Sequence, residues 1–301
     1  MKQKIAVVGL GNMGGRLAKR LLGQGHSVGV YDTNADTVQA FEALGAKAYE
    51  SLQTLGAAHK YVLTVLPNAE IVRKVVLGKN GLATGMRRGS VLIEMTTSVP
   101  SVTQEIAVAL DQSDIEMIDA PVSGGVKKAE SGTLTIMVGG DEQVLNEALP
   151  FLQCLGENII HVGSIGAGHT AKAINNLITA TTLAITSEAL VLSVKMGVDA
   201  QKMLDVINAG SGRSAASETK FPDQVLSRKF APGFSMALMS KDVGIALAMA
   251  RDVEAPVSVS EAVHKLWQHG VDGGRGEMDH TAIALTVEDM ANVQIKPGGN
   301  V

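Results

Sequence analysis

The sequence of 301 residues has little cysteine, few aromatic residues and no cluster of positive charge. The single cysteine, Cys154, excludes an internal disulfide and a cysteine-based metal site, and its neighbours Phe151, Leu152 and Leu155 predict a buried thiol. Aromatic residues make up 3% of the chain, which argues against a surface that stacks nucleic-acid bases. The formal net charge is −4, so the composition does not indicate a nucleic-acid partner.

Long hydrophobic runs are also missing, since no stretch reaches the roughly 18 consecutive apolar residues of a membrane-spanning helix. The chain begins MKQKIAVVGLGNMGG, where the apolar part is too short and too rich in glycine for a signal peptide. We therefore expect a cytoplasmic protein with no membrane partner. The scattered His264, His269 and His280 lack metal-ligand spacing, so no metal site is expected.

What is present is an alternation of strand and helix patterns in the first half of the chain. Buried-strand patterns occupy residues 4–10, 27–32, 61–66, 90–96, 116–122, 133–139 and 158–163. Helical spacing of apolar residues marks residues 12–25, 35–45, 70–77, 101–110 and 141–155. This alternation predicts an α/β Rossmann domain, a doubly wound and mostly parallel sheet with right-handed crossovers.

The second half has long helical patterns and no strand signal. Helices are expected over residues 170–196, 200–209, 239–252 and 257–270. We place the boundary near Ser164–Gly166, which gives an α/β domain over residues 1–164 and an all-helical domain over residues 165–301. Because no linker separates them, a ligand-binding cleft is expected where the domains meet.

The first site motif is GLGNMG, residues Gly9 to Gly14, which follows a strand and opens a helix. In this G-x-G-x-x-G spacing Gly9 permits a tight turn, Gly11 admits a pyrophosphate and Gly14 lets the helix pack on the strand. Asp32 ends the second strand, about 20 residues further on, where an acid binds ribose hydroxyls and repels the 2′-phosphate of NADP. The motif thus favours NAD, with NADP second; a helix N-cap or a solvated loop residue is the other interpretation of Asp32.

Two further motifs carry candidate chemistry. Ser123, Gly124 and Gly125 follow a strand and expose a hydroxyl and backbone amides that suit a carboxylate, although a plain turn has the same composition. Lys172 and Asn176 lie one turn apart near the start of an apolar helix. Desolvation and the helix dipole would lower the pKa of such a lysine toward neutrality, so that it could exchange a proton with a carbonyl oxygen. The alternative is a lysine whose amine reaches solvent along a polar face.

Taken together, the motifs resemble those of the β-hydroxyacid dehydrogenases. GLGNMG, LPN at 66–68, MTTSVP at 95–100, DAPVSGG at 119–125, GAGHTAKAINN at 166–176 and SKDVGIAL at 240–247 occur in the order and spacing of that family, over essentially the whole chain. The resemblance implies hydride transfer between a dinucleotide and a small β-hydroxy acid or its semialdehyde. It also implies a long interdomain helix and a homodimer or homotetramer.

The resemblance also assigns roles to individual residues. Catalysis falls to Lys172, with Asn176 holding substrate beside it. His169 is near the lysine and could assist it, but this position is variable in the family and His169 is interpreted as structural. Cofactor contacts fall to Gly9, Leu10, Gly11, Asn12, Met13, Gly14, Asp32, Thr33, Leu66, Pro67, Asn68, Thr96, Thr97 and Lys241. Substrate contacts fall to Ser123, Gly124, Gly125, Asn175, Arg213 and Lys241.

Arg213 and Lys172 bear on the choice of substrate and reaction. Arg213 lies in a Ser-Gly-Arg-Ser run like that of 2-(hydroxymethyl)glutarate dehydrogenase, which favours a second acidic group on the substrate, unless this arginine caps a helix or meets solvent. Imine reductases are similar through the cofactor domain but usually carry another residue in place of Lys172, so alcohol–aldehyde chemistry is favoured. A non-catalytic dinucleotide sensor on the same fold is the remaining alternative.

Overall fold

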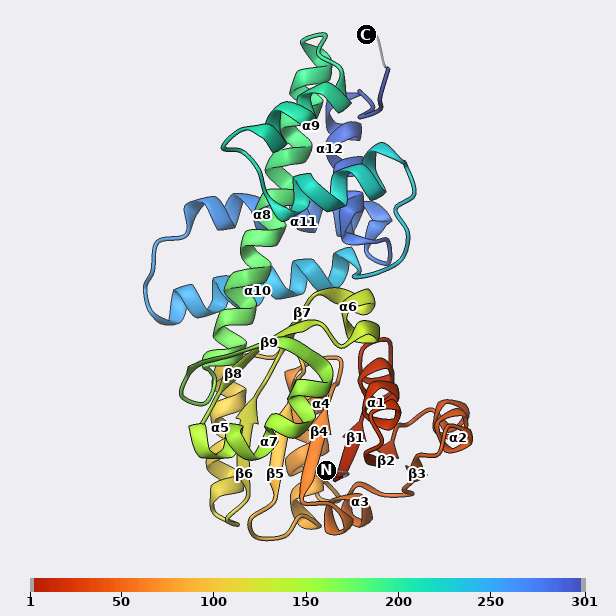
Figure 1. Ribbon diagram of the computed structural model, residues 1–301. Helices are drawn as coiled ribbons and strands as arrows, with labels where there is room; N and C mark the ends of the chain where they lie inside the picture. Colours follow the sequence, from red (N-terminus) through yellow and green to blue (C-terminus); the bar gives the residue numbers. More distant parts are fainter. Residues whose placement is uncertain (1–2, 299–301) are drawn as a thin grey trace. The chain divides into compact units, whose positions relative to one another are not determined.

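The computed structural model describes residues 3–298 of the chain (Figure 1). Contacts divide the chain into two compact units, one up to Lys172 and one from Ala173 onward. The division falls inside one long helix, α8 (Ala167–Lys195), so residues 167–172 of α8 belong to the α/β unit and the rest to the helical unit.

The α/β unit is built on one sheet, with the order β3-β2-β1-β4-β5-β6-β8-β7 and with β9 paired to β8. Pairing is parallel from β3 through β6 and between β8 and β9, whereas β8 runs antiparallel to β6 and to β7. The strands of this sheet within residues 3–298 are β1 (Lys4–Val8), β2 (Ser27–Tyr31), β3 (Lys47–Ala48), β4 (Tyr61–Thr64), β5 (Val91–Glu94), β6 (Glu116–Asp119), β7 (Val122–Ser123), β8 (Leu134–Gly139) and β9 (Gly156–Gly163).

Helices cover both faces of this sheet, which explains why its central strands read as continuous hydrophobic runs. Successive residues of β1 enter different cores: Ile5 and Val7 pack with α1 and α7, and Ala6 and Val8 pack with α3, α4 and α5. The helical segments of this unit are α1 (Gly14–Gly23), α2 (Ala35–Ala43), α3 (Leu52–Ala58), α4 (Ala69–Leu77), η1 (Leu82–Thr84), α5 (Pro100–Asp111), α6 (Gly125–Ser131) and α7 (Glu142–Leu155).

The second unit packs around the remaining turns of α8. Trp267 is fully buried there, and its Nε1 donates a hydrogen bond to the Ala180 carbonyl of α8 at 3.3 Å. The other helical segments of this unit are α9 (Ala200–Ala209), the π-helical η2 (Ala216–Leu226), α10 (Met236–Asp252), α11 (Ser258–Gly270), η3 (Val271–Arg275), η4 (His280–Ala282) and α12 (Ile283–Ala291).

Helix α8 is the one helix of the described residues that is long and apolar enough to cross a membrane by length and composition. Half of its most apolar window is buried inside the protein. Four large apolar side chains of α8 are exposed instead: Ile174, Ile178, Ile185 and Leu192.

The predicted fold class is confirmed, and the differences lie in element bounds. Helix α8 begins at Ala167 and α10 at Met236, each three residues before the predicted start. Helix α10 begins there because the side chain of Ser235 caps it by accepting from the Leu238 amide. The segments β3, α3, α6, η2 and α12 were not predicted, since they are short or lack a clear period. Cys154 is half-buried rather than buried, and its Sγ donates to the Pro150 carbonyl at 3.2 Å.

Candidate functional site

The three glycines after β1 have different surroundings. Gly9 has a φ of +92°, and a Cβ there would overlap the backbone carbonyl of Val65 on the adjacent strand segment. A Cβ on Gly14 would overlap the carbonyl oxygen of Gly9. A Cβ on Gly11, by contrast, would meet nothing within 4 Å. Gly9 and Gly14 are therefore required by the turn itself, whereas Gly11 leaves open space of the kind that a pyrophosphate needs.

Asp32 lies directly beyond β2, and its carboxylate joins the loops that follow the first two strands. Oδ2 accepts a hydrogen bond from the Leu10 amide at 2.6 Å, and Oδ1 accepts one from the Asn34 amide at 2.9 Å. Helix α2 is capped by Asn34 rather than by Asp32. The half-exposed Asp32 carboxylate is thus held in the glycine loop, where it retains lone pairs for ribose hydroxyls.

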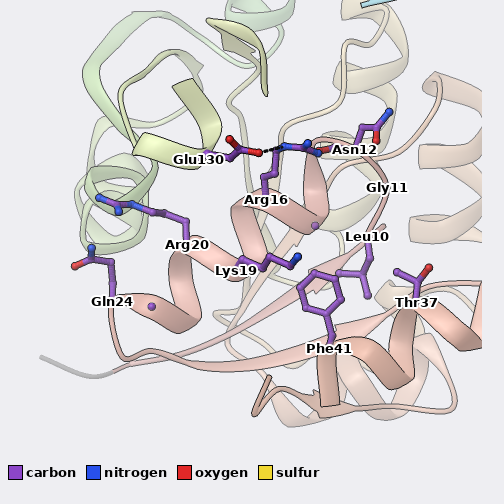
Figure 2. Close-up of a pocket in the computed structure, with 12 residues that line it drawn as sticks. Leu10, Gly11, Asn12, Arg16, Lys19, Arg20, Gln24, Thr37, Phe41 and Glu130 are labelled. Carbon is purple, nitrogen blue, oxygen red and sulfur yellow. Dashed lines mark hydrogen bonds and ion pairs between the residues drawn. The ribbon is translucent and has the colours of Figure 1, made fainter. Parts of the chain in front are cut away.

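A cavity of about 660 Å³ adjoins the glycine loop and is lined by α1, α2 and the loop itself (Figure 2). Three cations of α1 line it, and each contacts another part of the protein. Arg16 pairs with Glu130 at 2.8 Å, Arg20 donates to the Cys154 carbonyl at 3.0 Å, and the amine of Lys19 lies 5.8 Å from the centre of the Phe41 ring. Each of the three side chains thus has a partner elsewhere in the α/β unit.

The segments after β4 and β5 are joined by a hydrogen bond. The hydroxyl of Thr96, which is 2% exposed, accepts from the Leu66 amide at 2.9 Å. Asn68 caps α4 through its side chain, which accepts from the Ile71 amide at 3.0 Å, and Pro67 is exposed. Leu66 and Thr96 therefore lie together at the carboxyl end of the sheet, the end at which doubly wound sheets bind ligands.

Ser123 is the second residue of the short strand β7 and is half-buried. Gly124 and Gly125 follow with φ values of +132° and +70°, in the region that favours glycine. A Cβ on Gly125 would meet nothing within 4 Å. The loop therefore presents a hydroxyl and unshielded backbone at the predicted carboxylate position.

Lys172 is 9% exposed and lies in the first turns of α8. The start of this helix rests directly on the ends of β6 and β8: a Cβ on Gly168 would lie 2.5 Å from the Met137 carbonyl and 2.8 Å from the Asp119 carbonyl. Asp119 also accepts hydrogen bonds from the Gly166 amide at 2.7 Å and from the His169 amide at 2.8 Å. An acid of β6 thus satisfies the free amides at the N-terminus of the lysine helix.

Residues of the helical unit that sequence motifs single out are joined through Asp242, which is 1% exposed. The amide of Asn176 donates to Asp242 Oδ2 at 2.7 Å, and the amine of Lys241 lies 3.2 Å from Asp242 Oδ1. Asp242 was not a predicted site residue, although it stands next to Lys241 in the SKDVGIAL motif. A buried acid thus holds the Asn176 amide and has the Lys241 amine beside it.

The remaining predicted substrate residues lie on the surface of the helical unit. Arg213 has a side chain that is 64% exposed and that lies 3.6 Å from Glu218. Asn175 is exposed and is 3.4 Å from the side-chain oxygen of Asn176. Within residues 3–298 no group of acidic, histidine and cysteine residues is arranged to hold a metal ion.

Known proteins are similar to this chain over nearly its whole length. Residues 4–163 match the NAD-binding domain of 6-phosphogluconate dehydrogenase, and residues 166–287 match the NAD-binding domain of NADP-dependent 3-hydroxyisobutyrate dehydrogenase. The chain is 39% identical to 2-(hydroxymethyl)glutarate dehydrogenase of Eubacterium barkeri over 98% of both chains. A structure of Mycobacterium tuberculosis 3-hydroxyisobutyrate dehydrogenase with L-serine is 32% identical, covering 95% of this chain and 99% of that one, with a TM-score of 0.89.

The glycine loop, the strand order and these matches together define a dinucleotide-dependent oxidoreductase that acts on CH–OH groups. The chain belongs to the β-hydroxyacid dehydrogenase family, which includes the 3-hydroxyisobutyrate dehydrogenases, and it binds NAD(P). An imine reductase of Myxococcus stipitatus with NAD+ is 17% identical, covering 95% of this chain and 100% of that one, with a TM-score of 0.66. At this identity the likeness extends to the fold alone.

Proposed function

We propose that this enzyme interconverts a small β-hydroxy acid and its semialdehyde, with Lys172 as the proton relay. The observation that carries the proposal is the position of Lys172: a lysine that is 9% exposed, in the first turns of a helix anchored on the carboxyl end of a dinucleotide-binding sheet. A proton relay must lie within reach of the reacting oxygen, and the carboxyl end of such a sheet is where a bound substrate would meet the dinucleotide. Bound NAD(P)+ supplies the hydride acceptor at C4 of its nicotinamide ring.

The protein groups have separate tasks in this reaction. In the oxidation direction Lys172 accepts the hydroxyl proton as the carbonyl forms, and in the reduction it returns the proton to the carbonyl oxygen. The hydroxyl of Ser123 and the backbone of Gly124 and Gly125 bind the substrate carboxylate. Asn176, held by Asp242, donates to a substrate oxygen one helical turn beyond Lys172.

We infer that the substrate carries a second acidic group. The 39% identical relative is named for 2-(hydroxymethyl)glutarate, which is a dicarboxylic acid. The 32% identical structure contains L-serine, a β-hydroxy acid with one carboxylate, so both substrate types belong in the test. Arg213 is the cation proposed for the second acid, with Glu218 as its partner in the absence of substrate.

NAD is the proposed physiological cofactor. The carboxylate of Asp32, already bound by the Leu10 amide, would lie close to the ribose and repel a 2′-phosphate. Arg16 and Arg20 line the cavity beside the glycine loop and pair with Glu130 and with a backbone carbonyl. These pairings support a preference for NAD over NADP.

The decisive test compares Lys172→Ala with Lys195→Ala, which removes an exposed lysine from the other end of the same helix. Both variants are assayed at 340 nm on a panel of semialdehydes, mono- and dicarboxylic hydroxy acids and cyclic imines, and NADH binding is measured by fluorescence. We expect Lys172→Ala to bind NADH and lose turnover by at least about 100-fold, a typical contribution of acid–base catalysis. Near wild-type turnover in Lys172→Ala would overturn the proposal. A wild-type enzyme that reduces only the imines of the panel would overturn it as well.

We also propose a homodimer or homotetramer. Ile178, Ile185 and Leu192 are spaced by seven residues and form an exposed apolar stripe on α8 with Ile174. A second copy of the chain fits this stripe, because an apolar face can pair with itself about a two-fold axis. Light scattering should give a multiple of the chain mass for the wild type and a smaller one for Ile185→Glu; a monomeric wild type would exclude the assembly.

A further inference from the structure

His169 forms a charged cluster in the interior of the α/β unit. Its side chain is fully buried, and its Nε2 lies 3.0 Å from Oε2 of Glu94, at the end of β5. Its Nδ1 lies 3.6 Å from Oδ2 of Asp119, at the end of β6, and 2.8 Å from the hydroxyl of Thr103 in α5. One imidazole therefore contacts three elements of the fold from the first turn of α8.

The proton positions follow from these partners. Thr103 has one hydroxyl proton, which it donates to the Val99 carbonyl at 3.2 Å, so its oxygen accepts from Nδ1 of His169. Nε2 lies 3.0 Å from the Glu94 carboxylate, which favours a proton on this nitrogen as well. Burial lowers the pKa of His169, but the Glu94 carboxylate and the charge of Asp119 outweigh burial and raise that pKa above its ordinary value.

The cluster is connected to the predicted cofactor segment. Oε1 of Glu94 accepts from the Thr96 amide at 2.8 Å, and the Thr96 hydroxyl accepts from the Leu66 amide at 2.9 Å. A continuous chain of contacts thus runs from α8 through His169 and Glu94 to the segments after β5 and β4. Lys172 follows His169 by three residues, one helical turn along the same face.

A buried ion cluster is a poor way to stabilise a fold, because apolar residues of similar volume are often at least as stabilising. A cluster of this kind does fix geometry, since three of its four carboxylate oxygens accept a backbone amide and the fourth lies 3.0 Å from Nε2 of His169. We propose that His169 is a positioning residue: held between Glu94 and Asp119, it fixes the first turn of α8, and with it Lys172, relative to the segment of Leu66 and Thr96. This inference rests on the proposed role of Lys172 as proton relay.

The test is a double-mutant cycle between the cluster and Lys172. His169→Gln combined with Glu94→Gln replaces the charged pair by two neutral amides and leaves no unpaired buried carboxylate at Glu94. We expect NADH affinity within about threefold of wild type and a fall in kcat of about 100-fold, the cost of a catalytic group misplaced by about 1 Å. In a Lys172→Ala background the same two changes should cause no further loss of kcat.

A milder variant gives an answer even if the double substitution does not fold. Thr103→Val removes the partner of Nδ1 and should lower kcat by about three- to tenfold through the same route. Its control is Thr181→Val, a threonine of α8 whose hydroxyl bonds to the Leu177 carbonyl at 2.8 Å in the same way and which lies 12 residues further along the helix than His169. Thermal unfolding is measured for every variant.

The outcomes separate the two proposals. If Lys172→Ala keeps near wild-type turnover, the proton-relay role fails and the positioning role fails with it. If Lys172→Ala is inactive but the folded cluster variants keep kcat within about twofold of wild type, the positioning role alone is wrong. Equal losses of kcat in the wild-type and Lys172→Ala backgrounds would also overturn it, because a general loss of structure acts independently of Lys172.

Discussion

Alanine substitutions in the glycine loop should separate a requirement of the fold from a requirement of the ligand. At Gly14 an added Cβ would overlap the carbonyl oxygen of Gly9, a backbone atom that cannot move without shifting the loop. At Gly11 it would enter empty space, and Gly11 does not have the positive φ that alanine disfavours. Gly11→Ala should therefore affect dinucleotide binding alone, and Gly14→Ala should affect the fold.

The magnitudes follow from these contacts. Overpacking against backbone costs about 1–3 kcal/mol. Each kcal/mol lowers Tm by about 2–4 °C in a protein of this size, so the Tm of Gly14→Ala should be several degrees below that of the wild type. Gly11→Ala should leave Tm unchanged or raise it slightly, since alanine reduces the entropy of the unfolded chain by about 0.4–1 kcal/mol. A methyl group in the pyrophosphate position should weaken NADH binding more than about tenfold, or 1.4 kcal/mol.

The assay pairs calorimetric Tm with the Kd of NADH from its fluorescence. Gly23→Ala is the matched control, because a Cβ on Gly23, at the other end of α1, also meets nothing within 4 Å. The control should raise Tm slightly through the same entropy effect and leave the Kd of NADH unchanged. Wild-type NADH affinity in Gly11→Ala would refute the assignment of this open space to the pyrophosphate.

Three further predictions concern acidic residues. Asp32→Asn should narrow the ratio of kcat/KM for NAD over NADP, while Asp36→Asn, which removes an exposed acid from the start of α2, should not; a wild-type preference for NADP would contradict the argument. Asp242→Asn should lower kcat/KM by about 10- to 100-fold, since a hydrogen bond to a charged acceptor contributes about 1.5–3 kcal/mol, and an unchanged value would mean that Asn176 needs no such support. Burial raises the pKa of Asp279, but hydrogen bonds and the charge of His280 lower it to about 2, below the ordinary 3.8. Its stabilisation, about 1–2 kcal/mol, is complete above pH 3.8 and lost as pH falls toward 2, so the Tm gap between wild type and Asp279→Asn should narrow below about pH 4; a constant gap would contradict this.

The sequence predicted the fold class because the strands of the α/β unit are continuous apolar runs separated by helical periods. Bounds were less accurate wherever a contact distant in sequence decides them. Helix α8 begins at Ala167, before the apolar period at Thr170, because Asp119 of β6 accepts its first free amides. The residue pattern of α8 cannot show this start, because the acid that caps the helix lies on another element, β6.

The residues of the candidate site, whose roles stay predictions, differ in how clearly the sequence marks them. Motif spacing was sufficient for the glycine loop, because turn, ligand and helix requirements act within a few residues. The support behind the site was missed, since Glu94, Asp119 and Asp242 lie in segments that read as strand ends or as helix. A signal did exist: two neighbouring parallel strands, β5 and β6, both end in an acid after an apolar run, and parallel strands bring their carboxyl ends together.

The placement of Glu94 and Asp119 explains why α8, the helix that carries Lys172, can start inside a protein core. A helix N-terminus needs acceptors for its free amides, and a sheet edge that binds phosphates offers mainly donors. Asp119 supplies the missing acceptors for α8, and Glu94 holds the loop beside it. Two adjacent carboxylates would repel each other in the interior, and His169 between them offsets that repulsion. The identity of residue 169 is therefore coupled to the acids at 94 and 119, and a change at one of the three should require changes at the others.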